Sequence, residues 1–298
     1  MASTSWPKPI EPVAIDSDEL AQFRTEDEYT SVAVALMIET ASYCCLAAGT
    51  LGPSKVWDRN TAAVAGNVVR LYKLLDAFLD QVTKRREETA FVLARLAFET
   101  NVNVRYLARN FSPALIESYI SYSLRHEKKL FETIQSNIKL RNGIIMPIED
   151  RMIQSITRAA SAAGIPLENI DLKDKRPWGG KNVFDKTKDV GLEALYLAMF
   201  GGASHGIHGN WQEIYANHLE WDGAEAFTPK MKWRTPRPQM LTSMCLVTNE
   251  TLEEYFRFIG GEEVGDYFGE SLQNLQNRIL TFVQSHENYL GGKKWPSI

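Results

Sequence analysis

Two histidines lie three residues apart in a glycine-rich stretch of the second half of the chain. His205 and His208 are two of the five histidines in the sequence, and residues 196–215 around them contain four glycines. Residues at positions i and i+3 share one face of a helix, so we expect both imidazoles to point the same way. Each glycine inside a helix costs about 0.5–1 kcal/mol relative to alanine. The stretch therefore predicts a site where the glycines serve close packing or chemistry.

A second polar set lies on a helix that we expect over residues 87–109 and that is apolar on almost every other side. At about 100° per residue, four side chains fall in one narrow sector of this helix: Arg95, Glu99, Asn103 and Tyr106. A buried carboxylate must be paired or hydrogen-bonded, and Arg95 lies one turn before Glu99. Two interpretations stay open. The set is either a structural ion pair that fixes the register of the helix, or half of a polar pocket that the histidines complete.

Three kinds of role fit the histidine pair. As metal ligands, the histidines need one or two carboxylates, for which Glu39, Glu99 and Glu213 are candidates, but no HExxH motif is present. As metal-free acid and base groups, imidazoles beside an arginine suit the cleavage of a phosphodiester bond. In the third interpretation, the histidines only cap or pack a kinked, glycine-rich helix pair. Because the metal signal is weak, we assign no metal ligand and no cofactor.

Two irregular segments add residues that suit ligand binding. Residues 165–182 form a loop that is long enough to be functional. Residues 221–238 hold basic side chains and a tryptophan that suit a phosphate and a stacked base, or else form only a solvated connector. The predicted ligand-binding residues are Asn103, Tyr106, Trp178, Tyr196, Asn210, Lys232, Trp233 and Arg234. A Walker loop, a dinucleotide fingerprint and a GxSxG sequence are all absent, so the familiar enzymes with these motifs have no support.

The composition is typical of a soluble globular protein. The 298 residues carry a formal net charge of −4, which argues against bulk electrostatic binding of nucleic acid but leaves a local basic patch open. Three cysteines without metal-knuckle spacing fit a reducing cytoplasm. Residues 31–52 carry a single charge, Glu39, but Thr40, Ser42 and Thr50 make the segment only weakly hydrophobic, so we expect a buried helix there rather than a membrane span. No signal peptide is visible. We therefore predict a cytoplasmic protein without a membrane partner.

The hydrophobic pattern is helical almost throughout and predicts an all-α fold, a multi-helix bundle of about nine helices. We expect residues 1–25 to be extended or disordered and residues 26–290 to form a single helical domain. Cap and stop signals such as Ser112-Pro113 and Ala163-Gly164 divide this domain. The predicted helices cover residues 26–48, 57–84, 87–109, 113–140, 147–163, a group within 183–220, 239–259 and 262–286. We expect no strands.

The two polar regions resemble a known family. The sequence from Arg95 through Glu99 to Tyr106 resembles the arginine-x-x-x-glutamate helix of a widespread bacterial family known only as a domain of unknown function. The tryptophan–glycine loop at Trp178, followed by a tyrosine helix that ends in Ser-His205, resembles the second half of that family. The resemblance covers about residues 30–220. It implies an all-helical fold and a shared polar centre built from Arg95, Glu99 and His205, and it implies no particular activity.

A looser similarity links such helical domains to the HEPN superfamily, many of whose members are metal-free ribonucleases of toxin and phage-defence systems. Those enzymes use an arginine that is followed by a histidine after four to six intervening residues. This chain departs from the pattern, because no arginine stands at that spacing before any histidine. Ribonuclease chemistry here would require Arg95 to replace the missing arginine from another helix.

These observations give one leading hypothesis and two alternatives. The leading hypothesis is a helical effector of toxin or phage-defence type that cleaves a phosphodiester bond. In it, His205 and His208 act as acid and base, Arg95 stabilises the developing anion, and Glu99 orients Arg95 or a histidine. The expected partners are RNA or an anionic small molecule, together with a second copy of the chain or a protein from the same operon. The alternatives are a non-catalytic module that binds an anionic ligand or partner protein, and a metal-dependent hydrolase.

Overall fold

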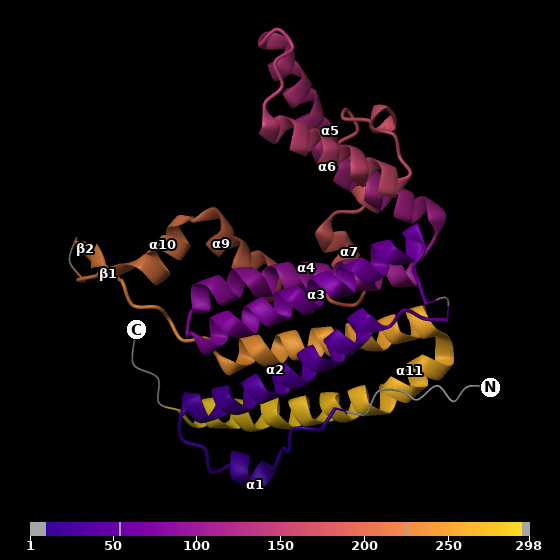
Figure 1. Ribbon diagram of the computed structural model, residues 1–298. Coiled ribbons are helices and arrows are strands. Elements are labelled where there is room, and N and C mark those ends of the chain that lie inside the picture. Colours follow the sequence, from indigo (N-terminus) through magenta and orange to yellow (C-terminus); the bar gives the residue numbers. More distant parts are fainter. Residues whose placement is uncertain (1–9, 54, 224–225, 294–298) are drawn as a thin grey trace.

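The computed structural model describes residues 10–53, 55–223 and 226–293, and within them all side chains except those of residues 203–205. This part of the chain is mostly helical, which confirms the predicted all-α, multi-helix bundle (Figure 1). The helices of the first half are α1 (Ser17–Leu20), α2 (Glu26–Gly49), α3 (Arg59–Thr83), α4 (Glu87–Arg109), α5 (Pro113–Leu140) and α6 (Pro147–Ala163).

The second half begins with short elements and ends with one long helix. Two 3-10 turns, η1 (Leu167–Asn169) and η2 (Trp178–Gly180), precede α7 (Val183–Asp189) and α8 (Glu193–Leu195). A π-helical turn, η3 (Tyr196–Gly201), leads into α9 (Gly202–His208), and α10 (Trp211–His218) follows. The chain then forms a short hairpin and the long helix α11 (Pro238–Gly292). Turns of π-helix are rare and are found frequently at functional sites.

Four long helices, α2, α3, α4 and α11, form the body of the molecule (Figure 1). The sequence of α3 explains its place, because the apolar residues at helical spacing are fully buried: Val64, Val68, Leu71, Leu75 and Phe78. By length and composition, α2 is the one described helix that is apolar enough to cross a membrane. In the structure it packs against both α3 and α11, as a core helix does.

The last helix, α11, turns back on itself at Gly261 (Figure 1), where the backbone has a φ of 73°. A β-carbon on the neighbouring Gly260 would lie 2.2 Å from a methyl carbon of Val264, so glycine is required at this turn. The sequence predicted two helices that part here, and the observed helix extends a few residues beyond their outer bounds.

A helical arm, residues 113–163, projects from the body (Figure 1). It consists of α5 and α6 packed against each other. Ser112 caps the first turn of α5 through a hydrogen bond from the backbone N–H of Leu115, and Gly164 ends α6 in the left-handed conformation. The arm has a small apolar core of its own, in which Ile134, Ile138 and Ile156 are buried together.

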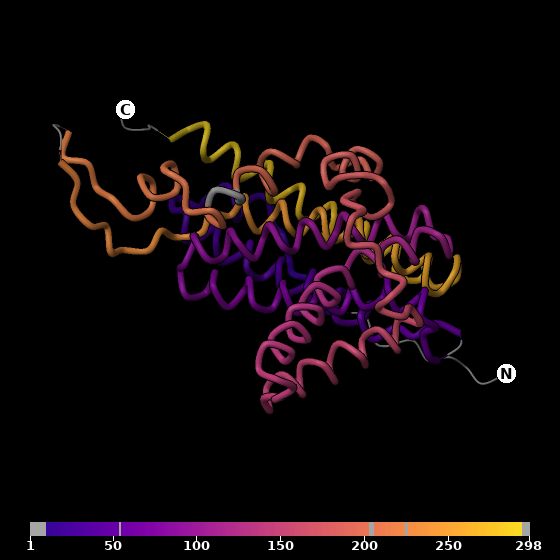
Figure 2. Tube along the Cα trace, turned by 90° about the horizontal axis from the view of Figure 1, so that it is seen from above, coloured from indigo at the N-terminus to yellow at the C-terminus, as the bar shows by residue number. Residues whose placement is uncertain are grey.

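A short antiparallel hairpin interrupts the helical pattern. Strand β1 (Leu219–Trp221) pairs with β2 (Phe227–Pro229). The sequence predicted no strand here, and this expectation was wrong because strands of three residues are too short to show a period-2 pattern. The rings of Trp211 and Phe227 meet at 5.8 Å between centroids and connect the hairpin to α10. Figure 2 shows the hairpin and the arm projecting from different parts of the body.

The described part of the N-terminal segment, residues 10–16, is extended and leads into α1. The backbone N–H of Val13 donates a hydrogen bond of 2.9 Å to Glu39 Oε2. The guanidinium of Arg278 pairs with the same carboxylate, with 2.5 Å between Nη2 and Oε1. Glu39 was a candidate metal ligand in the sequence. In the structure it has a different role, because its carboxylate connects α2 to α11 and to the N-terminal segment.

Candidate functional site

Helix α4 separates two polar regions of the molecule. One face of α4 packs against α11, and the other packs against η3, α7 and α9. The second face therefore meets the helix that carries the histidines, while the expected meeting of the side chains of the two polar sets stays a prediction. Two glycines of α9 lie at this contact. A β-carbon on Gly206 would lie 3.6 Å from a methyl carbon of Val92, and one on Gly202 would lie 4.0 Å from the ring of Phe91. The contacts with α4 would be ordinary van der Waals contacts, so alanine would fit against α4 at both positions; the tighter neighbour of Gly202 is the backbone carbonyl oxygen of Leu197, 3.3 Å from its β-carbon position.

Arg95 and Glu99 both lie on this second face and are half-buried. The guanidinium of Arg95 stands 4.2 Å above the ring of Phe200, at the end of the π-helical turn. His205 lies on α9, five residues after Phe200 in the chain. Its side chain lies outside the described residues. His208 is exposed at the end of α9. The structure thus brings α4 and α9 together, and it places His208 at the surface.

A buried lysine that the sequence analysis missed completes this face. Lys186 on α7 is 1% exposed, and its Nζ lies 3.4 Å from the ring centroid of Trp178 and 5.8 Å from that of Tyr106. Burial lowers the pKa of Lys186 to about 8, and the negative charge of Glu99 opposes this shift. Within the described part of the chain, the ammonium group has neither a hydrogen bond nor an ion pair. A lysine in such a setting is partly neutral near physiological pH.

The tryptophan–glycine loop positions the aromatic side of this cluster. Gly179 has a φ of 65°, and its backbone N–H donates a 2.9 Å hydrogen bond to Ser118 Oγ on α5. A β-carbon at Gly179 would lie 3.0 Å from Leu115 Cδ1, so the loop lies tightly against the arm. The ring of Trp178 meets that of Tyr106 edge-on, with 5.5 Å between centroids. Both residues were predicted to bind a ligand, and both are buried against the lysine instead of facing a cavity.

The remaining predicted residues of this region have identifiable places. Tyr196 packs between the rings of Phe184 and Phe200, at centroid distances of 4.9 and 5.0 Å. Asn103 is half-buried on α4. The side chain of Asn210 caps α10, because it accepts a 3.1 Å hydrogen bond from the backbone N–H of Glu213.

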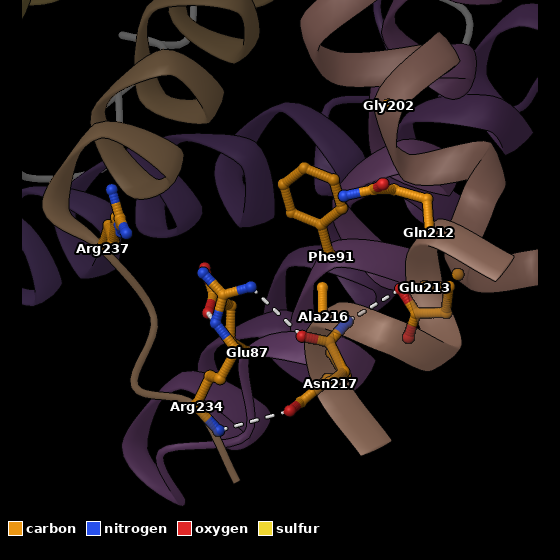
Figure 3. Close-up of a pocket in the computed structure, with 11 residues that line it drawn as sticks. Glu87, Phe91, Gly202, Gln212, Glu213, Ala216, Asn217, Arg234 and Arg237 are labelled. Atoms are coloured by element: carbon orange, nitrogen blue, oxygen red, sulfur yellow. Dashed lines mark hydrogen bonds and ion pairs between the residues drawn. The ribbon is translucent and has the colours of Figure 1, made fainter. Parts of the chain in front are cut away.

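A pocket of about 380 Å³ lies beside the N-terminal half of α4, between this helix, α9, α10 and the segment of residues 230–237 (Figure 3). We call it the α4 pocket. Charged and amide side chains, the ring of Phe91 and small residues of α9 and α10 line it, and most of the lining surface is apolar. The lining residues are Glu87, Glu88, Phe91, Gly202, Gly206, Gln212, Glu213, Ala216, Asn217, Arg234 and Arg237. A more apolar pocket of about 300 Å³ shares Glu87, Phe91 and Arg237 with it and extends to Met199 and Met240.

Arg234 ties the segment 230–237 to the first turn of α4. Its Nε lies 2.9 Å from Glu87 Oε2, and its Nη1 donates a 3.1 Å hydrogen bond to Asn217 Oδ1. The backbone carbonyl of Arg234 accepts from the N–H of Glu87, and its N–H donates to Glu88 Oε1. Asn217 in turn donates to Glu213 Oε2 at 2.8 Å. Arg234, which was predicted to bind a ligand, therefore lines the α4 pocket and holds the elements around the pocket together (Figure 3).

Two other side chains of the α4 pocket, Arg237 and Glu88, have fewer hydrogen-bond or ion-pair partners among the described residues. The exposed guanidinium of Arg237, which Figure 3 shows across the pocket from Glu213, has no hydrogen bond or ion pair within the described residues. Oε2 of Glu88 is buried and has no hydrogen-bond partner among the described side chains and backbone groups. Burial also raises the pKa of Glu87, an effect that the charges of Arg234 and Arg237 oppose. The sequence analysis included Arg237 only as one of the basic residues of the segment 221–238, and it did not assign Glu87 or Glu88 to a site, since charged residues beside a helix start are usually solvated.

The two other predicted residues of this segment, Lys232 and Trp233, do not line the α4 pocket. Lys232 is exposed, and Trp233 is 47% exposed with the guanidinium of Arg86 standing 5.5 Å from its ring centroid. Trp233 thus anchors the segment to the turn before α4.

No group of three His, Cys, Asp or Glu side chains in the described part of the chain has the geometry to hold a metal ion. The candidate carboxylates have other partners. Glu39 pairs with Arg278, and Glu213 accepts from Asn217 and lies 3.5 Å from His218 Nε2. The metal-ligand interpretation of His205 stays one of the alternatives from the sequence, because its side chain lies outside this part.

Comparison with known proteins identifies the family but not an activity. The profile of the family of unknown function DUF5677 matches residues 61–225, which is more than half of the chain. The chain therefore belongs to this family, as the resemblance of the Arg95 helix and the Trp178 loop predicted. The match runs from α3 to the hairpin and includes α4, α9 and α10. No curated protein and no solved structure matches the chain.

Proposed function

We propose that this member of the family binds a small anionic molecule, with a phosphate or carboxylate group, in the α4 pocket. The observation that carries the proposal is the guanidinium of Arg237, which borders the pocket without a hydrogen bond or ion pair among the described residues. A guanidinium presents its donors in a planar fork that matches a phosphate or carboxylate. Arg237 therefore supplies the anchor for the anionic group.

The three carboxylates of the pocket are engaged to different degrees, and only Glu87 has an arginine as its partner. Glu87 pairs with Arg234, and Glu213 accepts from Asn217. One oxygen of Glu88 accepts from the backbone, while the other, Oε2, has no donor. A buried acceptor without a partner costs about 1–3 kcal/mol, which a hydroxyl or amino group of the ligand would recover.

The shape of the site narrows the ligand class. The α4 pocket and its apolar neighbour meet at Phe91, and each has a volume of a few hundred Å³. Pockets for small molecules have volumes of roughly 300–1,000 Å³ and combine apolar walls with a few polar groups. A ligand that matches these features has an anionic end at Arg237, a hydroxyl or amino donor, and a flat or apolar part at Phe91. Nucleoside monophosphates and sugar phosphates belong to this class.

A thermal-shift panel followed by calorimetric titration tests the proposal. The probes are inorganic phosphate, pyrophosphate, a sugar phosphate and a nucleoside 5′-monophosphate, with the uncharged nucleoside as the control for the anionic group. We expect at least one anionic probe to raise the Tm and the uncharged nucleoside to leave it unchanged. The control variant is Lys73→Ala, which removes an exposed cation of α3 away from the pocket. If no anionic probe binds, or if the uncharged nucleoside binds equally well, the proposed function fails.

A second candidate function, cleavage of a phosphodiester bond, is favoured by Glu87. Its raised pKa suits a general acid or base, and it stands next to the guanidinium groups of Arg234 and Arg237. The backbone of His205 on α9 borders the same region, and its role as an acid or base is a prediction from the sequence. The roles assigned to Arg95, Glu99 and His208 in this chemistry are predictions as well.

Incubation of total RNA with purified protein tests this second function. The comparison includes the wild type, Glu87→Gln and His205→Ala, with Glu193→Gln as the control because Glu193 is exposed on α8. We expect the wild type and Glu193→Gln to cleave RNA and Glu87→Gln to lose most of the activity. Equal cleavage by all four proteins, or by none, would remove this candidate.

A further inference from the structure

The tip of the arm, where α5 ends and α6 begins, carries an exposed aliphatic patch. We call it the arm tip, and it consists of Leu140 (79% exposed), Ile144 (66%), Ile145 (54%), Met146 (45%) and Ile148 (50%). Single exposed apolar residues are common on proteins, but a cluster of this kind marks an interaction site. In Figure 1 the arm projects from the body, so no described helix of the body covers the tip.

The exposure of these side chains is fixed by local structure. Asn142 and Gly143 adopt positive φ values of 54° and 89°, which end α5 and reverse the chain. The carboxylate of Glu149 holds the loop from inside, because it pairs with the Arg141 guanidinium and accepts a 2.9 Å hydrogen bond from the N–H of Met146. Pro147 then starts α6. The apolar loop is therefore held outward by a buried ion pair, while the arm's own core is filled by other isoleucines.

The charge of the arm behind the tip is opposite to that of the chain as a whole. Residues 128–158 contain six lysines and arginines and three acidic residues, whereas the whole chain has a net charge of −4. Lys139, Arg151 and Arg158 are exposed along this part of the arm. An aliphatic tip with basic residues behind it is complementary to a bilayer that contains anionic lipids, whose headgroups attract lysine and arginine while the acyl region accepts apolar side chains.

The shape and composition of the tip favour a lipid surface over other occupants. The tip is a convex projection, so a folded partner would need a matching groove, whereas a bilayer needs none. It contains no aromatic side chain that would stack on bases, which argues against single-stranded nucleic acid. We infer that the arm docks the protein on an anionic membrane surface and inserts the arm tip among the lipids. This peripheral contact differs from the sequence-based expectation of no membrane partner, and it leaves α2 inside the body.

Vesicle flotation with the full chain tests this inference. The vesicles contain phosphatidylcholine alone or phosphatidylcholine mixed with phosphatidylglycerol. We expect binding to the mixed vesicles and a loss of at least about tenfold in the double variant Ile144→Asp/Ile145→Asp, since two inserted aliphatic side chains are replaced by charges. The control is Met231→Asp, which places one aspartate at another apolar position that is 87% exposed. We expect the control to bind like the wild type.

A charge variant separates the contributions of the tip and of the basic residues. Lys139→Glu/Arg151→Glu should weaken binding to the mixed vesicles by at least about tenfold, since each basic residue near an anionic surface contributes severalfold. Circular dichroism verifies the fold of all variants, which change only exposed side chains. The inference fails if the wild type floats with neither vesicle, or if the tip variant floats as well as Met231→Asp. It also fails if size-exclusion chromatography shows a dimer that depends on the tip while no vesicle binds, because a second copy would then cover the patch.

Discussion

The charged side chains on the two faces of α4 are paired to different extents. On the face toward α11, the guanidinium of Arg105 lies 2.9 Å from Glu250 and 2.8 Å from Glu254. Arg109 donates to both oxygens of the same Glu254. On the face toward residues 178–237, Lys186 and Arg237 have no ion pair among the described residues, and one oxygen of Glu88 has no hydrogen-bond partner.

This difference separates charges that hold the fold together from charges that are available to a ligand. Buried charged groups are normally paired, and incomplete pairing in a native structure calls for an explanation. The ion pairs with α11 connect segments about 150 residues apart in the chain, as their hydrogen bonds show. On the second face, Arg237 and Glu88 line a pocket, whereas Lys186 is buried against Trp178; on the α11 face, Nε of Arg105 is also buried without a partner among the described residues. The comparison thus assigns stability to the α11 side and binding to the other side.

The largest expected loss of stability follows from breaking the ion pair between Glu39 of α2 and Arg278 of α11. In Arg278→Met the carboxylate of Glu39, whose side chain is 1% exposed, loses its cation. We expect the free energy of unfolding to fall by about 3–5 kcal/mol, because removing one partner leaves a buried charge uncompensated. Urea denaturation measures this change. The control is Arg257→Met on the same helix, whose pairs are exposed and contribute at most about 1 kcal/mol. Equal losses in both variants would contradict the structural role of the Glu39 pair.

A smaller effect, with a pH dependence, is expected for Lys186. Its pKa is lowered to about 8 in the folded state, so the folded protein binds fewer protons than the unfolded chain between about pH 8 and 10.5. The burial of Lys186 therefore destabilises the wild type most below pH 8, and this penalty fades as the pH rises. Relative to Lys186→Met, the wild type should gain about 2–3 kcal/mol between about pH 7 and pH 10.

Urea denaturation at both pH values measures this gain, with Lys73→Met as the exposed control. The difference between wild type and Lys73→Met should change little with pH. If the difference in unfolding free energy between the wild type and Lys186→Met also changes little with pH, burial does not destabilise the charged form of Lys186. The contrast between the two faces of α4 then loses one of its supports.

The smallest expected effect on stability concerns Gly206, a glycine of α9 at its contact with α4. A β-carbon at Gly206 would make an ordinary contact with Val92, so Gly206→Ala should fold and gain up to about 0.5–1 kcal/mol from helix propensity. Gly261→Ala should instead lose about 1–2 kcal/mol, since its φ of 73° is strained for any residue with a β-carbon. Thermal denaturation compares the two. A large loss in Gly206→Ala would show that the two helices approach more closely than described.

Much of the fold was readable from local signals, and the site was readable only in part. The bounds of α4 and α5 were predicted well, because acidic residues begin α4 and Ser112-Pro113 begins α5. The shared face of Arg95 and Glu99 followed from helical spacing. The partner of Glu39 did not, because Arg278 lies 239 residues away. The burial of Lys186 is likewise a tertiary effect, since Asp185 and Lys188 close to it in the sequence are charged and the covering rings come from α4 and η2.

The α4 pocket shows the same limit. Arg234 was predicted as a ligand-binding residue because it lies in a basic segment with a tryptophan. Arg237 belongs to the same segment, but its incomplete pairing becomes visible only when the segment is folded against α4 and α9. The hairpin was missed for a different reason, because strands of three residues leave no periodic pattern.

The most direct test of the account is the dissociation constant of the anionic probe that binds best, measured by calorimetry for the wild type, Arg237→Lys and Arg237→Ala. Arg237 is exposed and has no described partner, so both variants should keep the unfolding free energy within about 0.5 kcal/mol. We predict that Arg237→Ala weakens binding by at least about tenfold, as expected for the loss of a charge-assisted hydrogen bond, and that Arg237→Lys lies between. An unchanged dissociation constant in Arg237→Ala would contradict the assignment of this face of α4 to anion binding.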